Sequence, residues 1–241
     1  MPPHNVSFEA NGRCIFAHGR VTTKPDLMTA DSASCFETLA RDGRWQAFTD
    51  GEHRKVDDFV RRWRIKTGDR VLEPGCGSGR LTVVLAALVG RKGRVLAFDS
   101  SRKFIRLAAR RRLPAQVRLR TVRAETVRLP PASFDHVICF NVFPHLVPPA
   151  VVARRLAAAL RPGGIFWIAH TYSRAFVNDV HRQGPAGIRG HLLQSRRKLT
   201  RLLREAGLTG VEIEDGADRF LARAIRPEAK PVQPPTARRH V

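Results

Sequence analysis

Short apolar runs alternate with longer amphipathic stretches through most of this chain. Seven of the short runs are rich in Val, Ile, Leu and Phe, and each predicts a β-strand. They cover residues 70–75, 94–99, 117–122, 134–141, 164–171, 210–215 and 219–225. A Gly-Ala pair follows the sixth run, so the last two predict an antiparallel hairpin.

The stretches between these runs carry apolar residues at helical spacing. They predict helices over residues 53–63, 80–90, 101–112, 149–160 and 195–207. Gly90 and Gly207 stand where a helix commonly ends, and Pro162 closely follows the fourth helix. Strands that alternate with helices favour an α/β fold, namely a doubly wound, mostly parallel sheet with the antiparallel hairpin at its C-terminal end.

The two ends of the chain lack this pattern. Residues 1–34 are polar and have no sustained period, so we expect an N-terminal extension, possibly disordered, before a domain over 35–226. The stretch from Met28 reads as a natural beginning, and translation from Met28 is a hypothesis. Residues 227–241 combine four prolines with charge and predict a disordered basic tail, because little apolar surface offsets the entropy of ordering.

Composition adds limits on class and location. A chain of 241 residues with 43% apolar residues suits one packed domain, and no apolar run is long enough to span a bilayer. The first residues lack the features of a secretory signal, so we expect a cytoplasmic protein. Four widely spaced cysteines with no CxxC pair favour reduced thiols over disulfides or a zinc ribbon.

The charge balance has two interpretations. Lys and Arg total 43 against 21 acidic residues, and the net charge of +22 would attract nucleic acid, anionic lipid or acidic substrates. The arginines are spread over the whole chain, however, which fits a general preference for Arg better than a binding stripe. Nucleic acid is therefore a possible partner that is not favoured.

The segment VLEPGCGSGRL carries the clearest chemical motif. Gly75, Gly77 and Gly79 follow a strand at alternate positions and precede a helix, so the backbone can turn sharply and approach a ligand closely. The spacing differs from the G-x-G-x-x-G of dinucleotide sites and disfavours NAD. Glu73, two residues before the first glycine, suits a cationic ligand with amino-acid character.

Asp99 closes the second predicted strand, 20 residues beyond Gly79. A carboxylate at this place can accept hydrogen bonds from both hydroxyl groups of a ribose. Taken alone, such an Asp is more often a helix cap. The glycine motif before it makes the ribose role the better interpretation.

From about Asp50 to Ile225 the sequence resembles the class I S-adenosylmethionine-dependent methyltransferases. The segments that carry the resemblance are VLEPGCGSG, FDSS, AETVRLP with FDHVICFN, and LRPGGIFWI. The resemblance implies a Rossmann-like fold, S-adenosylmethionine as cofactor, and an adenine contact from Glu125 with Ala124 beside it. Glu73 and Glu125 stand where Asp is commoner in the family. The implied cofactor-binding residues are Glu73, Gly75, Cys76, Gly77, Gly79, Asp99, Ser100, Ala124, Glu125 and Phe140.

Polar side chains follow the fourth and fifth predicted strands, at the edge where ligands sit in open α/β sheets. We expect them to face the acceptor as candidate catalytic residues: His145, His170, Tyr172, Asn178 and His181. Their pattern resembles a branch of small-molecule methyltransferases related to the quinone-type C-methyltransferases. A neutral imidazole is a suitable base for the acceptor proton, although these histidines can equally cap strand ends.

Three further questions stay open from the sequence. His145, His170 and His181, with Asn178, can be drawn as a zinc or iron site, but their separations enforce no geometry and we predict no metal. Residues 174–195 are placed to cover the acceptor pocket as a lid. The acceptor and the oligomeric state are not identified.

The leading functional hypothesis is a methyltransferase that acts on a small-molecule acceptor. One alternative is an RNA methyltransferase that uses the basic surface, although Asn141-Val142-Phe143-Pro144 departs from the motif of base-amino methylation. Another is a non-catalytic protein that binds the cofactor, because a fold alone does not grant activity.

Overall fold

The computed structural model describes residues 47–228 continuously, and in addition 7–8, 14–16, 19–20, Phe36 and Ala40. Strands β1 (Ser7–Phe8), β2 (Cys14–Phe16) and β3 (Gly19–Arg20) form a small antiparallel sheet. Met28, the hypothetical start of translation, and the tail beyond residue 228 lie outside the described residues. The proposed boundaries of the extension and the tail stay predictions.

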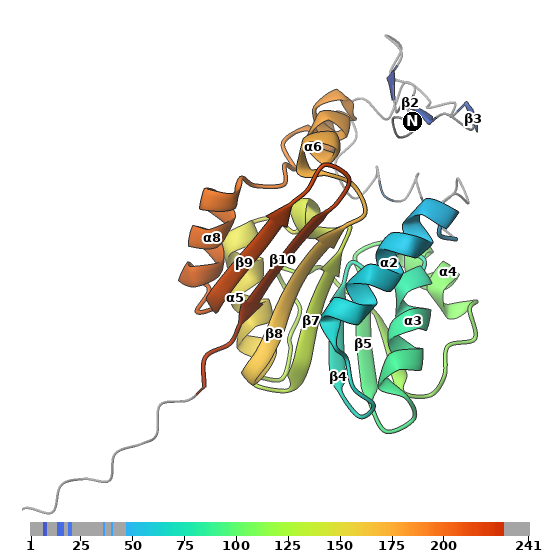
Figure 1. The fold of residues 1–241 in the computed structure, drawn as a ribbon. Coiled ribbons are helices and arrows are strands. Elements are labelled where there is room, and N and C mark those ends of the chain that lie inside the picture. The colour runs from blue at the N-terminus through green and yellow to red at the C-terminus, as the bar shows by residue number, and fades with distance from the viewer. Residues whose placement is uncertain are drawn as a thin grey trace, which may run out of the picture.

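The main sheet has seven strands in the order β6-β5-β4-β7-β8-β10-β9. Its first five strands are parallel, and β10 enters antiparallel between β8 and β9 (Figure 1). The prediction of a doubly wound sheet with a C-terminal hairpin is confirmed. The strands are β4 (Arg70–Pro74), β5 (Arg94–Asp99), β6 (Val117–Thr121), β7 (Phe134–Phe140), β8 (Leu160–His170), β9 (Thr209–Asp215) and β10 (Phe220–Ile225).

Helices cover both faces of this sheet. The face that receives Val71, Ile138 and Ala169 packs against α2 and α3. The opposite face receives Leu72, Val137 and Ile168 and packs against α5 and α8. This alternation of neighbouring strand residues is the period-two pattern of a sheet buried on both sides. The helices are α2 (Asp50–Trp63), α3 (Arg80–Val89), α4 (Arg102–Ala109), α5 (Pro149–Ala159) and α8 (Arg196–Glu205).

Two local differences from the sequence prediction have clear physical causes. Strand β8 begins at Leu160 rather than Gly164, because Leu160 has an extended backbone and pairs with Phe134 of β7. Pro162 therefore lies inside a strand. Helix α2 begins at Asp50, three residues earlier than expected, because Thr49 and Glu52 form a reciprocal capping box.

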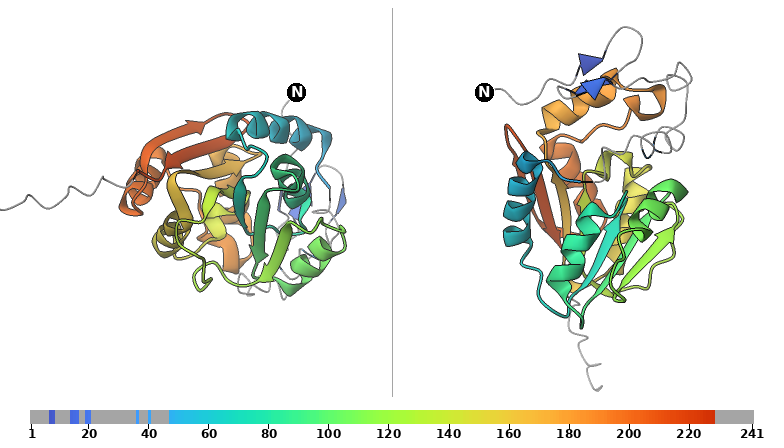
Figure 2. Two further views of the ribbon diagram at one scale, coloured as in Figure 1. Left: turned by 90° about the horizontal axis from the view of Figure 1, so that it is seen from below. Right: turned by 90° about the vertical axis from the view of Figure 1, so that its right-hand side faces the viewer.

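The segment expected as a lid contains two helices. These are α6 (Arg174–Gln183), which Ser173 caps through a bond from the Phe176 N–H, and the short α7 (Ala186–Arg189). Figures 1 and 2 show α6 beyond the end of the sheet where β8 finishes. The carboxyl ends of β4, β7 and β8 therefore lie at the edge of the sheet from which the chain continues into α6.

Within the described residues, no helix combines the length and the apolar character needed to cross a membrane.

Candidate functional site

The glycine-rich loop joins β4 to α3 and bends sharply. Gly75, Gly77 and Gly79 have φ values of +67°, +54° and +76°, a region that side chains rarely adopt. The N–H groups of Gly75 and Cys76 donate to the Phe98 carbonyl over 2.7 and 3.0 Å. These bonds hold the loop against the end of β5.

The three glycines have different surroundings. A Cβ on Gly75 would lie 2.2 Å from the Val142 side chain, and one on Gly79 would lie 2.9 Å from Ala108. Glycine is needed at these two positions because Val142 and Ala108 occupy the space that a side chain would take. A Cβ on Gly77 would meet no described atom within 4 Å. The space beside Gly77 is therefore open for a ligand that presses against the backbone.

Asp99 ends β5 and reaches across to this loop. Its Oδ2 accepts from the Gly77 N–H over 2.9 Å, and its Oδ1 accepts from the Ser101 N–H over 2.8 Å. Each carboxylate oxygen can accept a second hydrogen bond. Asp99 can thus fix the loop and still receive the hydroxyl groups of a ribose.

Glu73 lies under the same loop with 2% of its surface exposed. The Thr82 hydroxyl donates to its Oε2 over 2.6 Å. Burial raises the pKa of Glu73 to about 8, the Thr82 hydrogen bond opposes this rise, and the nearby Asp99 carboxylate adds to it. A cation bound beside the loop would favour the charged form and lower this pKa.

The other predicted cofactor residues occupy varied places. Cys76 and Ala124 are buried, and Ser100 is exposed. Glu125 forms an ion pair with Arg123. The Phe140 ring packs edge-on against Phe48 and Phe59, with centroids 5.9 and 6.5 Å away. Both described thiols, Cys76 and Cys139, are free and buried.

An ion pair that the sequence analysis missed joins the starts of α2 and α3. Arg80 Nη2 lies 3.1 Å from Glu52 Oε1, and the guanidinium stacks 4.5 Å over the Phe48 ring. Arg80 also donates to the Ala47 carbonyl over 3.1 Å. The Thr-x-x-Glu capping pattern at residues 49–52 was the signal that could have placed Glu52 here.

Three histidines meet beyond the ends of β7 and β8. His145 belongs to a 3₁₀ turn, η3 (Phe143–His145), His181 to α6, and His191 follows α7. His145 Nδ1 lies 3.2 Å from His191 Nδ1, and the ring centroids of His145 and His181 are 4.6 Å apart. Phe36 contacts His145 edge-on at 4.8 Å. His191 was not predicted.

Burial lowers the pKa of each of these three histidines, and for His145 neighbouring imidazoles lower it further. His170, at the end of β8, is 3% exposed and lies beside Phe220. Burial, assisted by His181, lowers its pKa to about 3. Its Nε2 is buried without a hydrogen-bond partner among the described residues. These imidazoles are therefore neutral near pH 7.

Two other predicted acceptor residues have defined contacts. The Asn178 amide donates to the Leu193 carbonyl over 3.0 Å and accepts from the Leu193 N–H over 2.7 Å. Asn178 is buried, so both halves of its amide serve to hold the segment after α7. Tyr172 stacks on Phe176 with ring centroids 4.7 Å apart, and Lys55 Nζ lies 5.5 Å from its ring centroid.

The metal site considered from the sequence is not assembled. Among the residues that the structure describes, no group of three or more His, Cys, Asp or Glu side chains is arranged to hold an ion. The contacts explain this result. His181 Nδ1 bonds to the His191 carbonyl, and the Asn178 amide bonds to Leu193.

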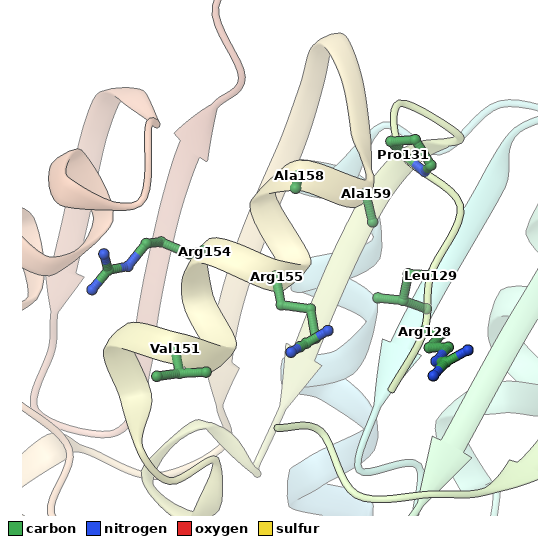
Figure 3. Close-up of a pocket in the computed structure, with 8 residues that line it drawn as sticks. All are labelled: Arg128, Leu129, Pro131, Val151, Arg154, Arg155, Ala158 and Ala159. Carbon is green, nitrogen blue, oxygen red and sulfur yellow. The ribbon is translucent and has the colours of Figure 1, made fainter. Parts of the chain in front are cut away.

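A separate pocket of about 550 Å³ lies between α5 and residues 128–131 (Figure 3). Its lining includes Arg128, Leu129, Val151, Arg154 and Arg155. In Figure 3 Arg155 points from α5 toward Leu129 and Arg128, whereas Arg154 points away from them. The lining contains neither the glycine-rich loop nor any histidine. This pocket is a basic surface feature distinct from the loop and histidine region.

Comparison with known proteins adds to this geometry. Residues 71–164 match the model of a family described as "Methyltransferase domain". The chain is 32% identical over 137 residues to the 2-phytyl-1,4-naphtoquinone methyltransferase of Synechococcus elongatus. The matched stretch covers 55% of each protein. It is 32% identical over 133 residues to the ubiquinone biosynthesis O-methyltransferase of Ralstonia nicotianae, over 54% of this chain and 50% of that protein.

The chain thus spans about half the length of the curated relatives it matches. Among solved structures, a SAM-dependent methyltransferase from Aquifex aeolicus has a TM-score of 0.61 and 22% identity. The match covers 82% of this chain and all of that one. It shows that the two chains share a fold.

Proposed function

We propose that this chain, which contains a class I S-adenosylmethionine-dependent methyltransferase domain, transfers the methyl group of that cofactor to a small-molecule acceptor. The observation that carries the proposal is the open space beside Gly77, whose N–H donates to Asp99, with Glu73 buried in the strand that leads into the loop. An adenosyl amino acid needs a close backbone approach, a ribose acceptor and a buried counter-charge, and these three residues supply them.

The residues fit the cofactor in chemical terms. When bound, S-adenosylmethionine supplies an electrophilic methyl group on a sulfonium. Asp99 would hold the ribose, and Glu73 would hold the charged amino-acid end, directly or through water. Glu125 with Ala124 would face the adenine. We assign Cys76, Ser100 and Phe140 to the same set on the strength of the sequence motif.

The histidine region would receive the acceptor. His145 lies in the turn after β7, and His170 is the last residue of β8. The end of β7 adjoins the glycine-rich loop, because Val142 contacts Gly75. Neutral imidazoles can orient a polar group or accept its proton. We assign His181, Tyr172 and Asn178 to the walls of this site. Asn178 also holds the segment after α7 in place.

We infer the acceptor class from the relatives and from the aromatic contact of Phe36 with His145 in the histidine region. The two named relatives are a naphtoquinone methyltransferase and a ubiquinone biosynthesis methyltransferase. We propose that the acceptor is a ring-containing small molecule and that the protein is cytoplasmic. The test is transfer of labelled methyl from the cofactor to a panel of phenols, hydroquinones, thiols and amines. Label in a ring compound supports the proposal, whereas tight cofactor binding without transfer to any class favours a non-catalytic role.

An RNA acceptor is the second candidate, and one observation favours it. Arg128, Arg154 and Arg155 line a single pocket. The hydrogen bonds of Arg154 and Arg155 go to the backbone carbonyls of Ala150 and Val127, and no ion pair among the described residues involves the three arginines. Phosphate contacts of this kind give binding that falls steeply with salt. The pocket lies along α5, away from the histidines, so we rank this function second.

A further inference from the structure

We propose that His145 and His191 form a proton relay from the acceptor to solvent, and that the acceptor is a neutral ring compound whose reacting oxygen carries a proton. This inference rests on the proposed function and deepens it. No earlier argument required His191, which is 46 residues from His145 in the sequence and 3.2 Å from it between Nδ1 atoms.

The hydrogen bonds restrict the tautomers of the cluster. A carbonyl oxygen only accepts, so His181 Nδ1 must carry a hydrogen to bond with the His191 carbonyl. Its Nε2 is then an acceptor when the ring is neutral. Between His145 and His191, two Nδ1 atoms at 3.2 Å bond when one of them is protonated. If His145 holds that hydrogen, its Nε2 is free to accept a proton.

The surroundings explain why a relay is needed. The titratable groups that act on His145 are His170 from β8, His181 from α6 and His191, all of them imidazoles. No described carboxylate contributes to stabilising an imidazolium at His145. A proton left on this partly buried ring, with no carboxylate beside it, would be costly. His191 is likewise half-buried and lies on the segment after α7, so a proton that reaches it can leave to water.

The transfer balances in atoms and charge. The acceptor oxygen forms its bond to the methyl group as the carbon–sulfur bond breaks, and its proton moves to His145 Nε2. The Nδ1 hydrogen of His145 moves to His191 Nδ1, and the Nε2 hydrogen of His191 leaves to water. Both rings end neutral with exchanged tautomers. The released proton carries away the positive charge that the sulfonium loses.

The scaffold around His191 supports this geometry. His181 holds the His191 carbonyl, and Asn178 holds Leu193 two residues further on. Both partners belong to α6, so one helix places the outer ring of the pair. Phe36 packs edge-on against His145 and gives this ring an apolar neighbour. His181 and Asn178 act as positioning residues.

The test uses the full chain with ¹⁵N-labelled histidine and bound S-adenosylhomocysteine. Nitrogen NMR should show scalar coupling across the bond between the two Nδ1 atoms, and acidification should protonate His191 before His145. His191→Phe should remove the coupling, and the exposed His53→Phe should not. Missing coupling, or earlier protonation of His145, would overturn the relay even where the cofactor binds normally.

Kinetics add a second readout with 4-nitrophenol and unsubstituted phenol as probe acceptors. His191→Gln should lower kcat for the protonated phenol by about 10²-fold, with little change in KM or in turnover of the ionised nitrophenolate. Added imidazole should restore part of the lost rate. Equal losses for both phenols would show a structural role and would overturn the relay. Failure of S-adenosylhomocysteine to bind would instead contradict the proposed function.

Discussion

The carboxylate of Asp99 accepts a hydrogen bond from the backbone N–H of Gly77 over 2.9 Å, although 22 residues separate them. The bond joins the end of β5 to the middle of the glycine-rich loop. It places a carboxylate, which we propose binds the ribose, beside the one glycine of the loop whose Cβ position is open among the described atoms. The proposed cofactor site follows from this contact.

Replacing Asp99 by Asn should weaken binding of S-adenosylhomocysteine by about 1.5–3 kcal/mol, because charge-assisted hydrogen bonds to the ribose are lost. Calorimetric titration measures the change. Asp135→Asn is the matched control, since Asp135 accepts from the Arg70 N–H over 2.7 Å at the opposite end of the sheet. If both variants lost the same affinity, the effect would be structural.

Glu73 predicts that cofactor binding depends on pH. Its pKa is raised to about 8 in the free protein, so the carboxyl is protonated at neutral pH. A bound cation lowers that pKa, and binding then releases a proton. Affinity should therefore tighten as pH rises from about 6 to about 8, by at most about tenfold per pH unit.

Calorimetry in buffers of different ionisation enthalpy counts the released proton. Glu73→Gln should remove this release. The folding linkage has a related sign: a raised carboxyl pKa makes the free protein lose stability as pH rises from the ordinary value of 4.5 through about 8. A pH-independent affinity in the native protein would show that Glu73 does not sense the ligand.

Asn178→Ala should lower the free energy of unfolding by about 2–4 kcal/mol, because it leaves the buried N–H and carbonyl of Leu193 without partners. Asp179→Ala is the neighbouring control on α6, with a side chain 62% exposed, and should change stability by under about 0.5 kcal/mol. Urea unfolding compares the two. Similar small effects would mean that Asn178 does not anchor this segment.

The basic pocket gives a test between the two acceptor classes. Arg128→Gln with Arg154→Gln removes two exposed charges at the pocket, and Arg196→Gln with Arg197→Gln removes two on α8. Fluorescence anisotropy with a labelled single-stranded RNA should show equal, small losses that vanish with modest salt. A much larger loss for the pocket variant would favour the RNA function.

The sheet could be predicted from the sequence because the signals for its strands and for the glycine-rich loop are local. Buried strands such as 94–99 and the glycine spacing at 75–79 are visible within a few residues, and helices between them impose parallel order. The errors arose where pairing overrides local signals. Pro162 correctly indicated that a helix ends before it, yet pairing of Leu160 with Phe134 of β7 starts β8 at Leu160 instead of the predicted Gly164.

The histidine cluster was predicted only in part for a related reason. His145, His181 and His191 come from three elements, and no periodicity links them. The histidines after β7 and β8 were found because strand ends converge at one edge of a sheet. His191 depends on the path of α6 and α7, which the sequence indicated only as a covering segment.

The central claim is that the space beside Gly77 holds the cofactor, and titration of S-adenosylhomocysteine into Gly77→Ala tests it most directly. Gly68→Ala is the control, because Gly68 also has positive φ and an open Cβ position but lies before β4. Both variants should lose about 1–2 kcal/mol of stability through backbone strain. We predict that Gly77→Ala binds at least about tenfold more weakly while Gly68→Ala binds like the native protein. Native-like affinity in Gly77→Ala would contradict the claim.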